Sequence, residues 1–90
     1  MAIAMYFNPA SFSAAQYDEV DAALDAAGVR TPAARLVHVC FGEGDKLQVF
    51  DVWESQEAFD EFGETLIPIL TARGIDPGQP MVAPVHNVIQ

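Results

Sequence analysis

Three side chains with acid–base chemistry lie in segments of this sequence that read as β-strands. His38 and His86 each lie in one apolar segment, and Asp51 lies in a third, two residues before Trp53. Histidine is the side chain best suited to exchange a proton near neutral pH. An ionised carboxylate inside a sheet is costly unless it is paired, hydrated or used. His38 and Asp51 are therefore the candidate catalytic residues.

A histidine base at position 38 would deprotonate a phenol or an enol, whose anion then reacts with oxygen or cyclises. Each of these residues also has a structural alternative. His38 can be a hydrogen-bonded core histidine, His86 a polar residue at a wet edge, and Trp53 a core or interface aromatic. The indole N–H of Trp53 needs an acceptor. The most economical role of Asp51 is therefore to accept from an indole, a histidine or a backbone N–H.

The charge balance is strongly acidic. The chain has 13 Asp and Glu residues against 4 Lys and Arg residues, and its net charge is -9. Nucleic acids and anionic membranes are bound by clustered cations, so neither is an expected partner. With no signal peptide and no membrane span in the sequence, we expect a cytoplasmic protein.

Cys40 is the only cysteine, so an internal disulfide is impossible. No Cys/His cluster has the spacing of a zinc site. No nucleotide-binding loop, nucleophile elbow or metal motif is found either, so no cofactor is predicted.

The chain reads as one domain, 1–90, of six elements. Ser13 with Gln16 forms a capping box that begins the first helix, and Ser55 caps the second. Pro84 predicts that the last strand lies at an edge or carries a bulge. The predicted order is strand 2–7, a helix from Ser13 to Gly28, strand 36–41, turn 42–45, strand 46–54, a helix from Ser55 to Gly74, and strand 81–89.

This order predicts an α+β fold, the ferredoxin-like βαββαβ arrangement, with two helices on one face of a four-stranded antiparallel sheet. Side chains alternate between the two faces of each strand. We expect the all-apolar set under the helices: Val37, Val39, Phe41, Phe50 and Val52. We expect the mixed set on the open face: Leu36, His38, Cys40, Leu47, Val49, Asp51 and Trp53.

The open face of this predicted sheet is too apolar to be left in water. We therefore expect a homodimer that packs sheet against sheet, with Asp51 in its interior. The C-terminal strand is a candidate to reach across to the partner.

The stretch "VFDVWESQEAFDEF" has an acid two residues before Trp, followed by Ser-x-x-x-Phe at the start of a helix. This pattern resembles the dimeric α/β-barrel superfamily, and in particular the small antibiotic-biosynthesis-monooxygenase-like proteins. The resemblance implies a dimeric α/β barrel with a cleft between the sheet and the helices of each protomer. It places the site acid and tryptophan of that group at Asp51 and Trp53.

Two positions depart from the patterns of that superfamily. Its quinol-type oxygenases often have a histidine where this chain has Phe62. Its haem-degrading members have a tryptophan there and a haem-ligating histidine where this chain has Ala72. The resemblance therefore argues against haem degradation and weakens the case for quinol oxygenation.

Two functional hypotheses follow. In the first, the protein binds a small aromatic or polyketide-like molecule without acting on it, or is structural. In the alternative, it is a cofactor-independent monooxygenase or a cyclase/isomerase with His38 as general base. The expected ligand-binding residues are Tyr6, Trp53, Phe62 and His86.

Overall fold

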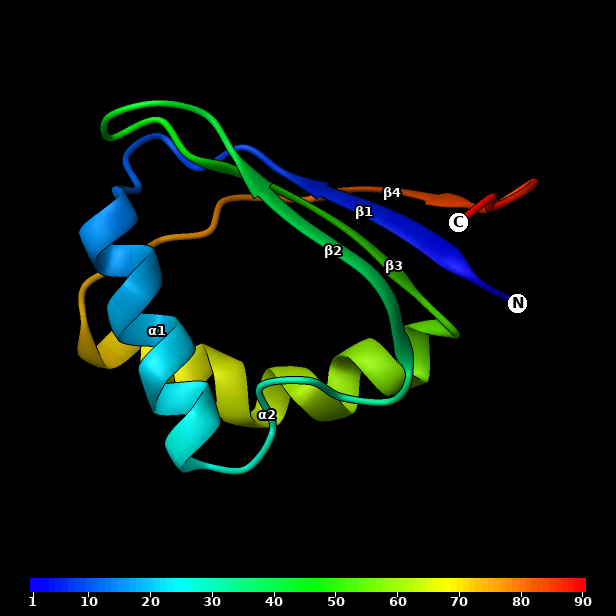
Figure 1. Cartoon of the computed structure of the whole chain (residues 1–90), viewed down its shortest axis with the longest axis horizontal. Helices are drawn as coiled ribbons and strands as arrows, with labels where there is room; N and C mark the ends of the chain where they lie inside the picture. The colour runs from blue at the N-terminus through cyan, green and yellow to red at the C-terminus, as the bar shows by residue number, and fades with distance from the viewer.

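The computed structural model describes residues 1–90, and its six elements follow the predicted order. They are β1 (Ile3–Phe7), α1 (Ala14–Ala26), β2 (Arg35–Phe41), β3 (Gln48–Trp53), α2 (Gln56–Ala72) and β4 (Met81–Pro84). The strands form one antiparallel sheet in the order β2-β3-β1-β4. Both helices lie on one side of this sheet (Figure 1). The ferredoxin-like α+β fold is confirmed.

Both predicted helix starts are present. Ser13 accepts from the backbone N–H of Gln16, and the Gln16 side chain accepts from the backbone N–H of Ser13. This capping box satisfies two backbone donors that the first turn leaves free. Phe12 and Tyr17 pack edge to face across it, with ring centroids 6.2 Å apart. The start of α1 therefore fixes the position of Tyr17 over the sheet.

The hairpin between β2 and β3 depends on Gly42. Its φ of +120° lies in the region that L side chains rarely adopt, and a Cβ there would lie 2.6 Å from the backbone oxygen of Lys46. Only glycine fits such a close approach of two backbones. This turn holds β2 and β3 in register as neighbours.

The last strand is shorter than predicted and lies at the edge of the sheet, one of the two placements that Pro84 predicts. Beyond it, the N–H of Val85 donates to the backbone oxygen of Ala2 at 3.0 Å. The Gln90 side chain donates to the backbone oxygen of Leu36 on β2 at 3.1 Å. The C-terminal segment 85–90 therefore crosses the open face within its own chain.

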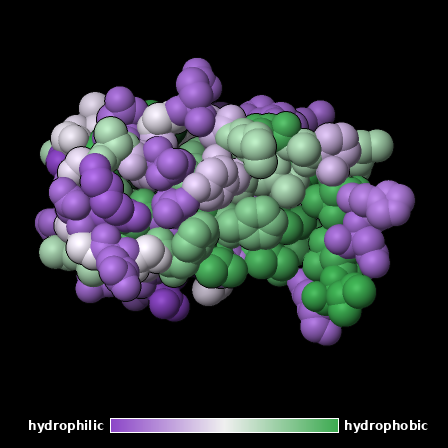
Figure 2. Space-filling model, turned by 90° about the horizontal axis from the view of Figure 1, so that it is seen from above, coloured by the Kyte–Doolittle hydropathy of each residue, from purple (hydrophilic) through white to green (hydrophobic).

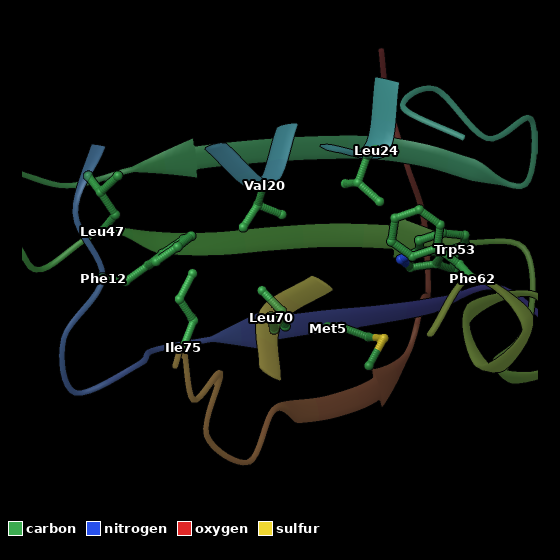
Figure 3. Close-up of a cluster of buried hydrophobic side chains, with 9 residues drawn as sticks. All are labelled: Met5, Phe12, Val20, Leu24, Leu47, Trp53, Phe62, Leu70 and Ile75. Atoms are coloured by element: carbon green, nitrogen blue, oxygen red, sulfur yellow. The ribbon is translucent and has the colours of Figure 1, made fainter. Parts of the chain in front are cut away.

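The hydrophobic core lies between the sheet and the helices. Trp53 and Met5 are its most completely buried large side chains. Trp53 contacts two aromatic rings of α2, with centroid distances of 5.6 Å to Phe59 and 5.0 Å to Phe62. Figure 3 shows Trp53 and Phe62 together at one end of the cluster, with Phe12 at the other.

None of the helices is long and apolar enough to cross a membrane.

The predicted assignment of the two strand faces is wrong. Trp53 and Asp51 are buried under the helices, whereas Phe41 and Phe50 lie on the open face, 42% and 37% exposed. Alternation correctly groups most residues but does not say which group meets the helices. The face that carries Trp53 packs against the helices, because the large Trp53 ring fills the space between the sheet and the rings of α2. Figure 2 looks onto the open face and shows the resulting hydrophobic band.

A β-bulge interrupts the alternation at the start of β2. Arg35 is opposite Trp53 and Val37 is opposite Val52, so two residues advance on β2 while one advances on β3. An extra residue of this kind re-aims the side chains that precede it. Arg35 consequently shares the helix side of the sheet with His38, although three positions separate them.

Candidate functional site

A buried carboxylate at the centre of β3 accepts two side-chain hydrogen bonds. Nδ1 of His38 lies 2.6 Å from Oδ1 of Asp51, and Nε1 of Trp53 donates to Oδ2 at 3.3 Å. Asp51 is only 5% exposed. A charge so far from water is tolerated when each oxygen has a donor. Asp51 therefore anchors both ring donors from within the core.

This arrangement determines which ring nitrogen of His38 can act as a base. An ionised carboxylate only accepts hydrogen bonds, so Nδ1 carries the proton that it shares with Asp51. Nε2 of the neutral ring is then an acceptor. It lies 2.7 Å from the phenol oxygen of Tyr17 on α1. The Tyr17 hydroxyl donates to Nε2, and the hydrogen-bonded chain runs from Trp53 through Asp51 and His38 to Tyr17.

Tyr17 keeps its proton well into the alkaline range. Its half-buried position raises the pKa of the phenol above the ordinary value, and the negative charges of Cys40 and Asp21 raise it further. The rings of Tyr17 and His38 are nearly parallel, 12° apart, with centroids separated by 6.0 Å. The hydroxyl is thus held on Nε2 by stacking as well as by the hydrogen bond.

His38 and Tyr17 line a mostly apolar cleft of about 100 Å³ between the helices and the sheet. Its polar edge also includes Asp51, Asp21, Arg30 and Arg35. A concave apolar site with a few convergent polar groups is the usual form of a small-molecule site. The hydrogen-bonded chain of four residues therefore ends in a space open to a ligand.

The two arginines at this cleft differ in their partners. Arg30 forms an ion pair with Asp21 at 2.9 Å. The Arg35 guanidinium lies near the rings of Trp53 and Phe62, with its Cζ atom 6.0 and 5.7 Å from their centroids. Its one polar contact is a hydrogen bond of 2.9 Å from Nη2 to the backbone oxygen of Arg30.

The residues predicted for the site fall into three groups. His38, Asp51 and Phe62 line the cleft. Trp53 is fully buried behind it and reaches it only through Asp51. Tyr6 and His86 lie on the opposite side of the sheet. There, Tyr6 donates its hydroxyl to Gln48, and exposed His86 lies beside Phe50 and Val52.

Tyr17 and Arg35 are among the cleft residues that were missed from the sequence. Tyr17 is visible there only as a partner of Phe12 at the helix start, and its contact with His38 joins segments 21 residues apart. Arg35 lies just before the predicted strand 36–41 and so was given no face, and the bulge at Leu36 that turns it toward the cleft cannot be read from the residues. A cation at the beginning of a strand was the only available signal.

Cys40 lies on the helix side of β2 near the cleft. Burial raises the pKa of its thiol, and the charges of Asp18 and Asp51 raise it further. A thiol with a raised pKa is a poor nucleophile near neutral pH. The chain has no cluster of three or more His, Cys, Asp or Glu side chains arranged to hold a metal ion.

The sequence matches no protein-family model and shows no significant similarity to a curated protein. Solved structures with the same fold are found over nearly the whole chain. A candidate antibiotic biosynthesis monooxygenase from Chloroflexus aurantiacus J-10-fl aligns with a TM-score of 0.70 at 13% identity. The alignment covers 100% of this chain and 98% of the other.

Two further structures share the fold at 18% identity. A variant of SnoaB, a cofactor-independent oxygenase from Streptomyces nogalater, has a TM-score of 0.67, with 98% of this chain and 96% of that chain covered. Rv0793 from Mycobacterium tuberculosis has a TM-score of 0.51, with 99% and 95% covered. This chain therefore has the ferredoxin-like fold of the antibiotic-biosynthesis-monooxygenase-like proteins.

Proposed function

We propose that the protein binds a small hydroxylated aromatic molecule in the cleft and oxidises it with molecular oxygen, with His38 as general base. The observation that carries the proposal is the 2.7 Å contact between Nε2 of His38 and a phenol, that of Tyr17, inside an apolar cleft. A substrate phenol or enol would occupy the same acceptor. The likeness in fold to a cofactor-independent oxygenase supports this class of reaction.

In the proposed reaction, the substrate hydroxyl displaces that of Tyr17 and gives its proton to Nε2. Asp51 stabilises the imidazolium, because its carboxylate is already hydrogen-bonded to Nδ1. The resulting anion is electron-rich and reduces O₂ as a carbon–oxygen bond forms. Loss of water from the hydroperoxide, with the proton returned by His38, leaves a quinone. One phenol and one O₂ thus give one quinone and one water.

The size of the cleft limits the ligand. At about 100 Å³ the space is smaller than an apolar cavity of about 150 Å³ that holds benzene in another protein. An aromatic ring therefore enters as the Tyr17 ring moves aside from the half-buried position it occupies. This favours substrates with a single aromatic ring.

Oxygen uptake with purified protein and a panel of phenols and hydroquinones tests the proposal. We expect consumption above the rate without protein, and loss of about 10²–10⁴-fold in that rate in His38→Gln. Gln keeps the ring's approximate size and a polar contact to Asp51, so its thermal unfolding serves as the control for folding. Equal rates in both proteins would refute a base at position 38.

A second candidate function is binding without turnover. It is favoured by Tyr17, whose hydroxyl already satisfies Nε2 and leaves no base free until it moves. In that case, phenols raise the melting temperature by mass action, but neither oxygen uptake nor product follows. The same panel, measured by both methods, separates the two functions.

We also propose that the open face packs against a second copy of the chain. Its exposed apolar side chains, Val39, Phe41, Phe50 and Met81, form a larger hydrophobic band than water-exposed sheets usually carry. The segment 85–90 covers only one end of this face, beside Val52. Sedimentation at micromolar concentration should therefore report a dimer.

A further inference from the structure

The Arg35 guanidinium lies at the cleft without a carboxylate partner. The only ion pair that an arginine or lysine of the chain forms is that of Arg30 with Asp21. Arg35 is half-buried, and a single hydrogen bond, to the backbone oxygen of Arg30, uses one of its five N–H donors. The other donors of this guanidinium are available to a ligand.

The carboxylates that line the same cleft are already occupied. Both oxygens of Asp21 accept from Nε of Arg30, at 3.0 and 2.9 Å. The oxygens of Asp51 accept from His38 and Trp53. Neither acid therefore neutralises Arg35 by direct contact, and the guanidinium remains the unpaired cation of the site.

The position of this cation is unusual for the chain as a whole. Only 4 residues are basic against 13 acidic ones, yet both Arg30 and Arg35 line the cleft. Arg35 reaches it only because of the bulge at Leu36, and bulges beside functional sites commonly re-aim a side chain. Anions are repelled by most of this surface, so a local cation is needed wherever one is to be bound.

We infer that the natural ligand of the cleft carries a carboxylate, and that Arg35 is the residue that selects it. This rests on the proposed function in that the same ligand presents a hydroxyl to His38. The ligand class is thus a hydroxylated aromatic carboxylic acid. A planar guanidinium binds a carboxylate through two parallel hydrogen bonds, which fixes the orientation of the aromatic ring as well as adding affinity.

The competing explanation is that Arg35 serves only to cover Trp53 and Phe62. The distances to the two rings, 6.0 and 5.7 Å, are compatible with this packing role. A packing role makes no distinction between a charged ligand and a neutral one of the same shape. The two explanations therefore differ in what the variant does to selectivity.

Titration calorimetry with the 2-, 3- and 4-hydroxybenzoates and the matching hydroxybenzamides measures that selectivity. Each amide keeps the shape and the hydroxyl of its acid but lacks the charge. We expect at least one acid to bind wild type about 10- to 100-fold more tightly than its amide, the range for hydrogen bonds to a charged group. Arg35→Gln should bring the acid down to the affinity of the amide.

Two variants complete the experiment. Arg35→Lys keeps the charge without the planar fork and should retain part of the preference, which also covers the case in which Arg35→Gln fails to fold. Arg73→Gln removes an exposed arginine that is not part of the cleft, and should leave every affinity unchanged. The inference is overturned if Arg35→Gln keeps the preference, if amides bind wild type as tightly as acids, or if none of the six compounds binds.

The outcomes for Arg35 and for the proposed function can be told apart. Amides that bind as tightly as acids, together with turnover that depends on His38, would refute the role of Arg35 alone. An acid preference lost in Arg35→Gln, together with oxygen uptake unaffected by His38→Gln, would leave the carboxylate site intact and refute the proposed base.

Discussion

His38 and Asp51 are direct cross-strand partners on β2 and β3, and their side chains meet beneath the helices with Nδ1 and Oδ1 2.6 Å apart. The pairing of β2 with β3 therefore brings these two side chains together directly. Strands are rigid supports compared with loops, so this orientation of the imidazole is well defined. The cleft is built around that pair, with Tyr17 above it and Trp53 behind it.

Replacing Asp51 by Asn tests whether the carboxylate matters beyond its shape. The amide oxygen can still accept from His38, but it cannot stabilise an imidazolium by charge. We expect oxygen uptake to fall by about 10²–10⁴-fold, with the protein still folded. An unchanged rate in Asp51→Asn, at a normal melting temperature, would show that His38 needs no ionic partner.

Replacing Tyr17 by Phe frees Nε2 of His38. The ring that packs on Phe12 and His38 is retained, while the hydroxyl that competes with a substrate is lost. We expect phenols to bind Tyr17→Phe at least severalfold more tightly, because the ligand no longer displaces an internal hydrogen bond. The dissociation constants, measured by calorimetry, decide the point. Weaker binding would instead make Tyr17 a ligand contact.

The stability of the protein should fall at high pH through Tyr17. Since burial raises its pKa in the folded state, the folded chain holds this proton more tightly than the unfolded chain does. The contribution of this proton to the free energy of unfolding is complete below pH ~10, the ordinary pKa of tyrosine. It is lost as the pH rises through the pKa of Tyr17 in the folded state. Urea unfolding at pH 8 to 11 should therefore show a steeper decline for wild type than for Tyr17→Phe. Cys40, whose pKa is also raised, is present in both proteins, so the desolvation of its thiol contributes to both declines. Parallel declines would contradict this assignment.

Trp53→Phe should destabilise the protein. The indole is fully buried against two aromatic rings and donates to Asp51, so the variant leaves a cavity and one carboxylate oxygen without its donor. We expect a loss of about 2–4 kcal/mol in the free energy of unfolding, from urea titration. Phe59→Leu, which trims the same aromatic cluster without touching Asp51, is the matched control. A loss no larger than that of the control would mean that the hydrogen bond adds nothing.

Phe41→Asp tests the open face. The side chain is already 42% exposed in the single chain, so a carboxylate there stays hydrated and costs the monomer little. We expect dissociation of the proposed dimer, seen as a halved mass by sedimentation, with far-UV circular dichroism unchanged. Glu43→Gln, in the neighbouring turn, is a control that should leave the mass unchanged. A wild-type protein that sediments as a monomer would contradict the proposed dimer.

Most of the fold is readable from local patterns. The capping box at Ser13 and the caps at Ser55 and Gly28 are set by nearest neighbours along the chain, and the structure has each of them. The edge position of β4 is one of the two placements that the missing N–H of Pro84 predicts. Such features need no knowledge of distant contacts, because the residues that satisfy one another lie within a few positions.

The sequence by itself determined the set of elements and their order. It also determined that His38 on β2 and Asp51 and Trp53 on β3 share one face of the sheet. Only the tertiary structure decided that this face lies under the helices, since alternation is symmetric until the bulk of Trp53 is matched to the rings of α2. It also decided that Tyr17 meets His38 and that Arg35 turns into the cleft. Both depend on packing between segments distant in the chain and on a bulge whose free energy is set by the whole sheet.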